Sequence, residues 1–396
     1  MSAVKAKDDA IPLFGEGSRC VHIHNIEISN RTRDQKEIVS AIQGNWFETV
    51  LYVGAVRGSK TTVDHQFTAC EVIHLPNGSA QRGSILKKIT GFRAWGNAVE
   101  ELLKGTRVDV IHAHSLPTLP LAIRLKKLTG CKVVYDCHEL ETEVQILNSF
   151  TKPIYKRLER KHIFQCDSVV TVSDSIADWY ANAYGIKRPY IVRPVPDTSW
   201  QKLEPVVDLR GRFGVPKDRP LFIYQGILNQ TIINLLIAAW DKVAPDRHIV
   251  FMGFGAGKPT VEEAAHAKPN IHFIPAVAPE DLLRYTAGAD AGFDYRDPSN
   301  LSWRYTIPNK VMEYWTAGIP LVTDGIGVEL DRIIKQTGAG WCVDRNAETL
   351  STWVNSVSLQ EIAQAAERTR VFAKTLSWQH EADEMRKAYE EALGKP

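Results

Sequence analysis

The sequence lacks the marks of a secreted or membrane-embedded protein. Six cysteines are scattered along the chain without a C-x-x-C pair, and they are Cys20, Cys70, Cys131, Cys137, Cys166 and Cys342. Neither a disulfide framework nor a cysteine zinc site is therefore expected. The N-terminus has no hydrophobic region long enough for export, and no later run reaches the roughly 18 apolar residues of a membrane span. We expect a cytoplasmic protein that is soluble or peripheral at the inner face of the cytoplasmic membrane.

An excess of charge of one sign is also lacking. Basic and acidic residues number 48 and 46, which leaves a formal net charge of +2. Because no global positive field attracts a polyanion, no nucleic-acid partner is expected. Internal repeats and low-complexity tracts are absent from the sequence as well, so function has to be sought in local motifs.

Length and hydrophobic pattern predict two α/β domains. A chain of 396 residues is too long for one ordinary core and suits two domains of roughly 180 residues each. Short apolar runs alternate with helical patterns, and their continuous hydrophobicity indicates parallel sheets covered on both faces. The expected strands are Cys20–His24, Thr49–Val53, Glu71–Leu75, Asp109–Ala113, Lys132–Asp136, Ser168–Val172 and Tyr190–Val192, then Leu221–Gln225, Ile249–Met252, Ile271–Ile274, Ala291–Asp294, Leu321–Thr323 and Gly340–Val343. The Pro-rich stretch Arg193–Pro205 separates the two series, and we expect a disordered tail at 1–18, a first domain at 19–200 and a second at 201–377.

The segment Ile307–Pro320 carries the clearest chemical signal. Pro308 suits the first turn of a helix, and Gly318 suits its left-handed stop. Lys310 then lies near free backbone N–H groups that favour an anion such as a phosphate. Glu313 follows one turn later and can accept hydrogen bonds from neutral hydroxyls such as those of a ribose. The segment therefore indicates a nucleotide-sugar site, although a plain Pro-opened helix is the alternative.

A second signal follows the apolar run Val133–Tyr135. The sequence Asp136-Cys137-His138-Glu139 puts an imidazole and a carboxylate just past a strand end, where ligands bind in open α/β sheets. These groups suit binding of sugar hydroxyls or handling of a proton. A helix N-cap at Asp136 followed by acidic first-turn residues explains the same pattern equally well.

Several segments together carry a resemblance to a known family. Ile307–Pro320 is similar to the donor-binding helix of the retaining GT-B glycosyltransferases, in the variant P-N-K-x-x-E-Y-x-x-A-G-x-P. Further similar segments, in the expected order, are Asp109–Pro120, Val133–Leu140, Cys166–Ser173, Leu221–Gly226 and Ile249–Gly255. The resemblance runs from about residue 20 to the end of the chain. It implies a GT-B fold, in which two Rossmann-like doubly wound parallel-sheet domains face a central cleft and the helix of 378–396 packs back on the first domain.

The resemblance also implies roles for individual residues. His138, with Glu139 beside it, matches the position at the reacting sugar, Gly226 matches the glycine that lets the donor diphosphate approach the backbone, and Glu313 matches the ribose ligand. The acceptor-facing positions are Arg31, Arg33 and His114. The full expected donor set is Gly226, Asn229, Gly255, Arg304, Tyr305, Asn309, Lys310 and Glu313.

Two departures from the family pattern concern the donor site. Tyr305 stands where relatives have the first glutamate of a pair whose second member matches Glu313, and a phenol replaces only part of its hydrogen bonding. The loop Ile227–Thr231 lacks the usual Arg and Lys, so Lys310 is the first candidate to neutralise the diphosphate, with Arg304 or Arg296 in reserve. The Gly-rich turn Gly253–Lys258 fits neither a phosphate loop nor a dinucleotide fingerprint, and we interpret it as a turn lining the donor pocket or as a plain turn.

Two basic stretches predict further contacts of the first domain. Ser84–Lys104 and Phe150–Phe164 combine cations with apolar residues in a helical pattern. Such faces suit an anionic membrane surface or the pyrophosphate of a lipid-linked acceptor, whereas a simply solvated helix is the alternative.

The leading hypothesis is a glycosyltransferase. It would transfer a sugar from a nucleoside diphosphate sugar, with a UDP-sugar favoured, to a hydroxyl of a glycan or lipid-linked acceptor with retention, in bacterial polysaccharide or glycoconjugate synthesis. The resemblance implies no metal and no cofactor besides the nucleotide-sugar co-substrate. A non-catalytic GT-B protein that binds a nucleotide sugar or supports a partner enzyme is the alternative, and an epimerase on the same fold is less favoured.

Overall fold

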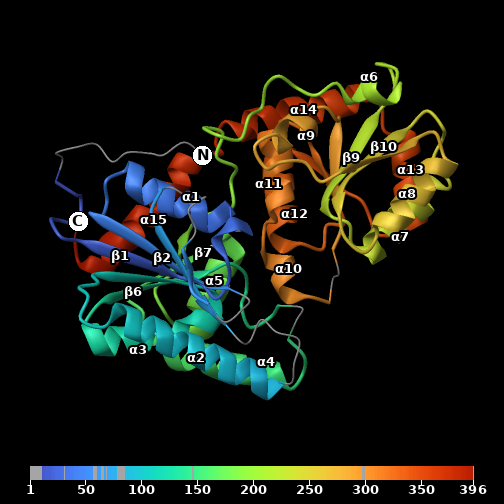
Figure 1. Ribbon diagram of the computed structural model, residues 1–396. Coiled ribbons are helices and arrows are strands. Elements are labelled where there is room, and N and C mark those ends of the chain that lie inside the picture. Colours follow the sequence, from blue (N-terminus) through green and yellow to red (C-terminus); the bar gives the residue numbers. More distant parts are fainter. Residues whose placement is uncertain are drawn as a thin grey trace. The chain divides into compact units, whose positions relative to one another are not determined.

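The computed structural model describes residues 11–30, 32–56, 60–63, 67, 69–77, 85–144, 147–296 and 299–395, without the side chains of 30 and 85–89. The chain forms two compact units (Figure 1), one of Met1–Arg193 with Glu381–Pro396 and one of Pro194–His380. Within the tail expected to be disordered, residues 11–18 are ordered, since Phe14 is buried and its N–H donates to Trp46 O at 2.9 Å. Arg31 lies outside the described residues.

Unit 1 is built on an eight-stranded sheet in the order β3-β4-β2-β1-β5-β6-β7-β8. The strands are β1 Arg19–Ile23, β2 Thr49–Val56, β3 Thr62–Val63, β4 Glu71–Pro76, β5 Val110–His114, β6 Lys132–Cys137, β7 Ser168–Thr171 and β8 Tyr190–Ile191. All pairs are parallel except β3 with β4, which is antiparallel. Most apolar side chains of the parallel strands are buried on both faces, as a parallel sheet requires.

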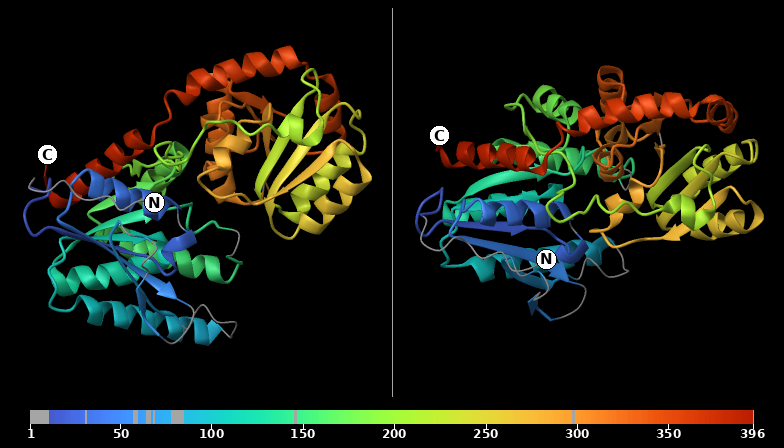
Figure 2. Two further views of the ribbon diagram at one scale, coloured as in Figure 1. Left: turned by 45° about the horizontal axis from the view of Figure 1, so that its top comes forward. Right: turned by 90° about the horizontal axis from the view of Figure 1, so that it is seen from above.

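Helices cover both faces of this sheet. They are η1 Ile28–Asn30, α1 Thr32–Gln43, α2 Ile85–Leu103, α3 Ser115–Thr129, α4 Thr151–His162, η3 Ile163–Gln165, α5 Asp174–Tyr184 and α15 Trp378–Leu393. Helices α1 and α15 lie on one face, and α2 and α3 lie on the other (Figure 2). On the first face, Tyr389 of α15 is fully buried and its hydroxyl lies 2.7 Å from His112 Nδ1 of β5.

Unit 2 is built on a six-stranded sheet in the order β11-β10-β9-β12-β13-β14, in which every pair is parallel. The strands are β9 Leu221–Ile227, β10 His248–Phe254, β11 Ile271–Pro275, β12 Ala291–Asp294, β13 Leu321–Thr323 and β14 Gly340–Cys342. The helices are α6 Leu209–Phe213, α7 Gln230–Trp240, α8 Lys258–Ala267, α9 Leu282–Thr286, α10 Leu301–Tyr305, α11 Asn309–Thr316, α12 Val328–Thr337, α13 Ala347–Ser356 and α14 Leu359–Ala373.

Two hydrophobic cores lie on opposite faces of the unit 2 sheet. Phe222 and Trp240 belong to one core, and Ile223 and Trp315 belong to the other. Adjacent residues of β9 therefore face different cores, as the two-residue repeat of a strand dictates. The expectation of two doubly wound parallel-sheet domains is confirmed.

The strand predictions are confirmed in both units, with one omission. The antiparallel edge strand β3 spans only Thr62 and Val63, and both residues are exposed, so no apolar run marks it. Within the part of the chain that the structure describes, no helix combines the length and apolar character needed to cross a bilayer.

Candidate functional site

The first group of candidate residues lies at the carboxyl ends of β9 and β10 in unit 2. Gly226 has φ +97°, and a Cβ there would meet only Lys310 Cε, at 3.9 Å. Gly255 has φ +138°, and a Cβ there would lie 2.9 Å from Leu228 O. The surface beside Gly226 is therefore open to a ligand, whereas the space beside Gly255 is filled by the backbone that follows β9. Gly255 consequently serves the turn, and its expected donor contact stays a prediction.

Helix α11 brings a cation to Gly226. Pro308 precedes the helix and Asn309, exposed, opens it. Lys310 Nζ lies 4.1 Å from the centre of the Tyr224 ring and 3.6 Å from Asp294 Oδ1. Burial opposes ionisation of Asp294, but Arg296 and Lys310 outweigh it and lower the pKa of this carboxyl. An ammonium group thus sits near the open glycine and the first turn of a helix, which is an arrangement suited to a phosphate.

Glu313 lies one turn further along α11. Its Oε2 accepts a hydrogen bond from Gln225 Nε2 at 2.6 Å, and Gln225 Oε1 accepts one from Thr286 Oγ1 at 2.8 Å. The carboxylate is therefore held in place by β9 and α9. Because an ionised carboxylate has about four acceptor sites, Glu313 can still accept hydrogen bonds from ligand hydroxyls.

The remaining donor candidates differ in their surroundings. The Asn229 side chain caps α7 by accepting from Thr231 N and Ile232 N. Arg304 is exposed, and it lines a pocket with Arg296 and Trp303. Tyr305 is half-buried at the end of α10. The structure thus brings Gly226, Lys310 and Glu313 together, while the donor roles of the others stay predictions.

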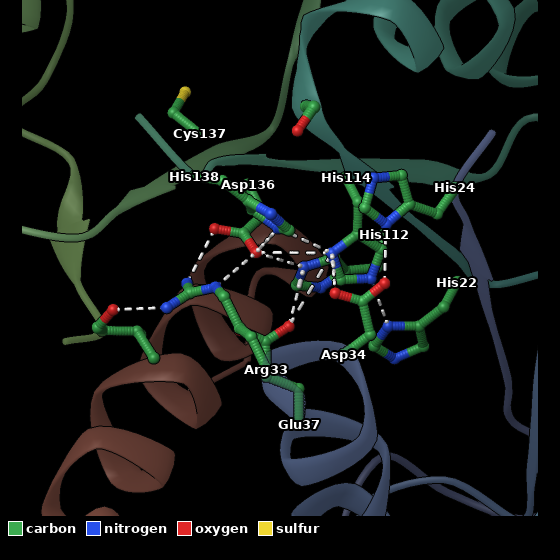
Figure 3. A network of polar contacts seen from close by, with 12 residues as sticks. His22, His24, Arg33, Asp34, Glu37, His112, His114, Asp136, Cys137 and His138 are labelled. Carbon is green, nitrogen blue, oxygen red and sulfur yellow. Dashed lines mark hydrogen bonds and ion pairs between the residues drawn. The ribbon is translucent and has the colours of Figure 1, made fainter. Parts of the chain in front are cut away.

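Unit 1 holds a second group, made of alternate residues on three neighbouring strands. His22 of β1 pairs in register with His112 of β5, and His114 of β5 pairs with Asp136 of β6. His24 comes two residues after His22, and His138 comes two residues after Asp136. Because side chains two residues apart in a strand point to the same side, all of these side chains lie on one face of the sheet. Helix α1 covers this face and contributes Arg33 and the carboxylates of Asp34 and Glu37 (Figure 3).

His138 is the most exposed member of this group, with a side chain 15% accessible. Its Nε2 lies 2.9 Å from Asp136 Oδ2 and 3.1 Å from His114 Nδ1. Burial opposes protonation, but Asp136 and Asp34 outweigh it and raise the pKa of His138 to about 9. The ring is therefore an imidazolium at neutral pH, a hydrogen-bond donor through both nitrogens. Glu139 beside it is half-buried.

Arg33 and His114 lie inside the protein. The Arg33 guanidinium donates to both oxygens of Asp136, at 2.8 and 3.1 Å, and to Val192 O at 2.6 Å. His114 is fully buried. Both residues hold the Asp136–His138 pair in this arrangement, and their expected contact with an acceptor stays a prediction.

The backbone directly after β5, beside this group, is strained at Ser115. Ser115 has φ +63°, a left-handed conformation that a non-glycine residue adopts only when its surroundings impose it. Glu141 fixes this corner to the His138 loop, because its two oxygens accept from Leu116 N and His138 N, each at 3.2 Å. Burial raises the pKa of Glu141 to about 7.

Sequence reasoning missed most of the unit 1 group. His22, His24, Asp34, Glu37 and His112 were not expected at a site. The signal that marks them is the two-residue spacing H-I-H, H-A-H and D-C-H on three expected strands. Such spacing puts each pair on one face, although the order of the strands in the sheet is needed to bring the pairs together.

Comparison with known proteins identifies the family. Residues 48–199 match the family model described as Glycosyltransferase Family 4, and residues 219–358 match the one described as Glycosyl transferases group 1. No curated protein sequence matches this chain.

Solved structures share the fold at low identity. Sucrose-phosphate synthase from Thermosynechococcus elongatus aligns with a TM-score of 0.71 at 16% identity, over 95% of this chain and 99% of that one. HepE from Anabaena, in complex with UDP and glucose, aligns with a TM-score of 0.69 at 14% identity, over 94% and 99%. WaaG, a glycosyltransferase involved in lipopolysaccharide biosynthesis, aligns with a TM-score of 0.64 at 13% identity, over 93% and 98%. With two family matches and this fold, the chain belongs to the GT-B glycosyltransferases.

Proposed function

We propose that this protein transfers a sugar from a UDP-sugar to a hydroxyl of a glycan or lipid-linked acceptor, with retention of anomeric configuration and without a metal ion at the diphosphate. The observation that carries the proposal is the grouping of Lys310, Gly226 and Glu313 at the strand ends of unit 2. The HepE structures with UDP and with UDP-glucose support the choice of nucleotide.

Each residue of this group has a distinct task in the proposal. Gly226 lets the diphosphate approach the backbone, and Lys310 with the first N–H groups of α11 neutralises its charge. Glu313 accepts from the ribose hydroxyls. Because the leaving diphosphate gains negative charge as the glycosidic bond breaks, Lys310 stabilises the transition state more than the bound donor.

Unit 1 supplies groups for the sugar and the acceptor in this proposal. The His138 imidazolium donates to an oxygen of the transferred sugar, and Asp136 and Arg33 hold its charge and orientation. Because a protonated imidazole is no base, His138 binds and orients rather than abstracting a proton.

A non-catalytic nucleotide-sugar-binding protein is the second candidate. Two features favour it, namely Tyr305 in place of a glutamate and the neutral loop Ile227–Thr231. Labelled donor incubated with membrane extract separates the two, because transferred label is expected only from an enzyme.

UDP binding tests the donor site directly. We expect UDP to raise the melting temperature of the wild type, and Lys310→Ala or Glu313→Gln to weaken UDP binding about 10- to 100-fold, since each loses hydrogen bonds that involve a charge. Lys335→Ala is the matched control, because Lys335 is an exposed lysine of α12 whose Nζ lies 2.7 Å from Asp331 Oδ2. Unchanged UDP affinity in both site variants would refute the donor site.

We also propose that α4 contacts an anionic membrane surface. Phe150, Ile154 and Phe164 are 84%, 64% and 55% exposed, and they accompany the exposed cations Arg157, Arg160 and Lys161. The other basic stretch is Ser84–Lys104. Its Trp95 is fully buried and donates from Nε1 to Gly54 O at 2.9 Å, and the side chains of 85–89 lie outside the described residues. The wild type should float with anionic liposomes at low salt, whereas Ile154→Asp combined with Arg157→Glu should not. A wild type that does not float at low salt contradicts this contact.

A further inference from the structure

Four residues beneath His138 converge on one point. His22, Glu37, His112 and His114, here called the quartet, are all fully buried, and one potential ligand atom from each lies within 4.8 Å of the others. His22 Nδ1 lies 3.0 Å from His114 Nε2, and His112 Nε2 lies 3.5 Å from Glu37 Oε2. Ligands of one tetrahedral zinc ion are about 3.3 Å apart when each bond is about 2.0–2.1 Å. These two separations match that spacing, and the other ligand-atom pairs of the quartet lie within 4.8 Å of one another (Figure 3).

Part of the quartet lacks hydrogen bonds. Among the described residues, neither oxygen of Glu37 nor Nε2 of His112 has a hydrogen-bond partner. Arg33 Nε lies 3.0 Å from Glu37 Oε1, within ion-pair distance, but not in hydrogen-bond geometry. Buried polar atoms are ordinarily satisfied, and a buried carboxylate is ordinarily paired or bound to a metal. His112 Nε2 lies 3.5 Å from Glu37 Oε2 and 3.6 Å from Asp136 Oδ2, so an ion bound beside it would be close to both carboxylates.

In His22 and His112, the ring nitrogen that points away from the other ligand atoms has the kind of partner that a metal-bound histidine usually has. His112 Nδ1 lies 2.7 Å from the Tyr389 hydroxyl, and His22 Nε2 lies 3.5 Å from the same oxygen. His114 Nδ1 lies 3.4 Å from Asp136 Oδ2, 3.1 Å from His138 Nε2 and 4.0 Å from Glu37 Oε2. A hydroxyl or carboxylate on the outer nitrogen fixes the tautomer that presents the inner lone pair to a metal. His22 and His112 have such a partner, and both ring nitrogens of His114 lie close to polar groups.

The charge of the surroundings favours a cation. Three carboxylates lie in this buried layer, those of Asp34, Glu37 and Asp136, and all have fully buried side chains. Two cations face them, the Arg33 guanidinium and the His138 imidazolium, so three carboxylates stand against two positive charges. A divalent ion would offset negative charge that burial makes costly.

We propose that the quartet binds one divalent transition-metal ion, zinc by preference, as a structural site. Three imidazole nitrogens and one carboxylate oxygen suit zinc, and four protein ligands leave no open position for substrate. The ion would join β1 and β5 to α1 beneath His138. This structural ion has no part in the proposed transfer, which uses no metal at the diphosphate.

Metal content of the purified full-length chain is the test. Protein without an affinity tag, produced with zinc in the medium, should retain about one equivalent of zinc after gel filtration. His112→Gln and Glu37→Gln should each retain at least tenfold less. His248→Gln is the matched control, since His248 Nδ1 lies 3.1 Å from His272 Nε2 in a histidine pair of unit 2, and it should retain the wild-type content. Equal zinc in wild type, His112→Gln and Glu37→Gln would overturn the proposal.

Measurements on the wild type keep the test independent of variant folding. Refolding with cobalt(II) should give the visible absorption of a tetrahedral ion, and X-ray absorption of the zinc protein should show only nitrogen and oxygen neighbours at about 2.0–2.1 Å. Removal of zinc by unfolding in chelator and refolding should lower the melting temperature, and added zinc should restore it. A wild type that folds without bound metal and gains no thermal stability from zinc would instead have a hydrogen-bonded histidine cluster.

Discussion

At the scale of single residues, His272 of β11 is a buried titratable group outside both candidate sites. Its ring stacks on Phe213 at 4.4 Å, and its Nε2 lies 3.1 Å from His248 Nδ1. Burial, with a smaller contribution from His248, lowers the pKa of His272 to about 4 from 6.5. Since the folded protein resists protonation of this ring, its stabilising contribution is present above pH 6.5 and is lost as the pH falls toward 4.

His272→Gln should therefore reduce the acid sensitivity of unit 2. Between pH 7.5 and pH 5 the free energy of unfolding should fall by about 1 kcal/mol less in the variant than in the wild type, a value discounted for partial solvent access. Urea unfolding at the two pH values measures this difference. His266→Gln serves as the control, because His266 is exposed on α8. Parallel losses in wild type and His272→Gln would contradict the assignment.

Prediction from the sequence was least successful for which single side chains lie together in space. The positions of Lys310 and Glu313 followed from local spacing on one helix, and the structure brings both to Gly226. The grouping of His22 with Glu37 depends on the order of strands and on a helix that covers them. No local pattern contains that information, because it arises from contacts between segments far apart in the chain.

At the scale of elements, β9 and β10 place two glycines side by side with different requirements. A Cβ on Gly253, at φ +148°, would lie 1.9 Å from Gly226 O, whereas one on Gly226 would meet no atom closer than 3.9 Å. Gly253→Ala should therefore destabilise unit 2 by about 3 kcal/mol through backbone displacement and strain. Gly226→Ala should cost only about 1 kcal/mol through its positive φ, yet weaken UDP binding by filling the open surface. Thermal unfolding and UDP titration measure both effects, and equal melting temperatures would refute the distinction.

Elements were also predicted best where they are long and apolar. Buried parallel strands such as β2 and β10 are continuous hydrophobic runs, and helix α15, Trp378–Leu393, begins where the helix of 378–396 was expected to begin. Strand β3 has two exposed residues and exists only because β4 offers an edge to pair with. Its formation depends on a partner strand rather than on its own composition.

At the scale of the whole molecule, the last helix completes the core of unit 1. Tyr389 is fully buried, and its ring lies 5.2 Å from that of Phe47 and 6.0 Å from that of Trp46. Glu381 accepts a hydrogen bond from Arg193 N at 2.6 Å. Residues at the two ends of the chain thus share one core, and the stability of unit 1 depends on α15 although unit 2 separates them in sequence.

Two truncations of large side chains test whether the units are separate folding units. Tyr389→Ala should destabilise unit 1 by about 3–5 kcal/mol, because it leaves a cavity and an unpaired His112 nitrogen. The transition of unit 2, recognised by its shift with UDP, should stay unchanged. Trp240 is 1% exposed in the unit 2 core, so Trp240→Ala leaves a cavity there. This variant should lower only the melting temperature of the transition that UDP shifts. Calorimetry with and without UDP resolves the two, and a fall of both transitions in either variant would mean that the units unfold as one.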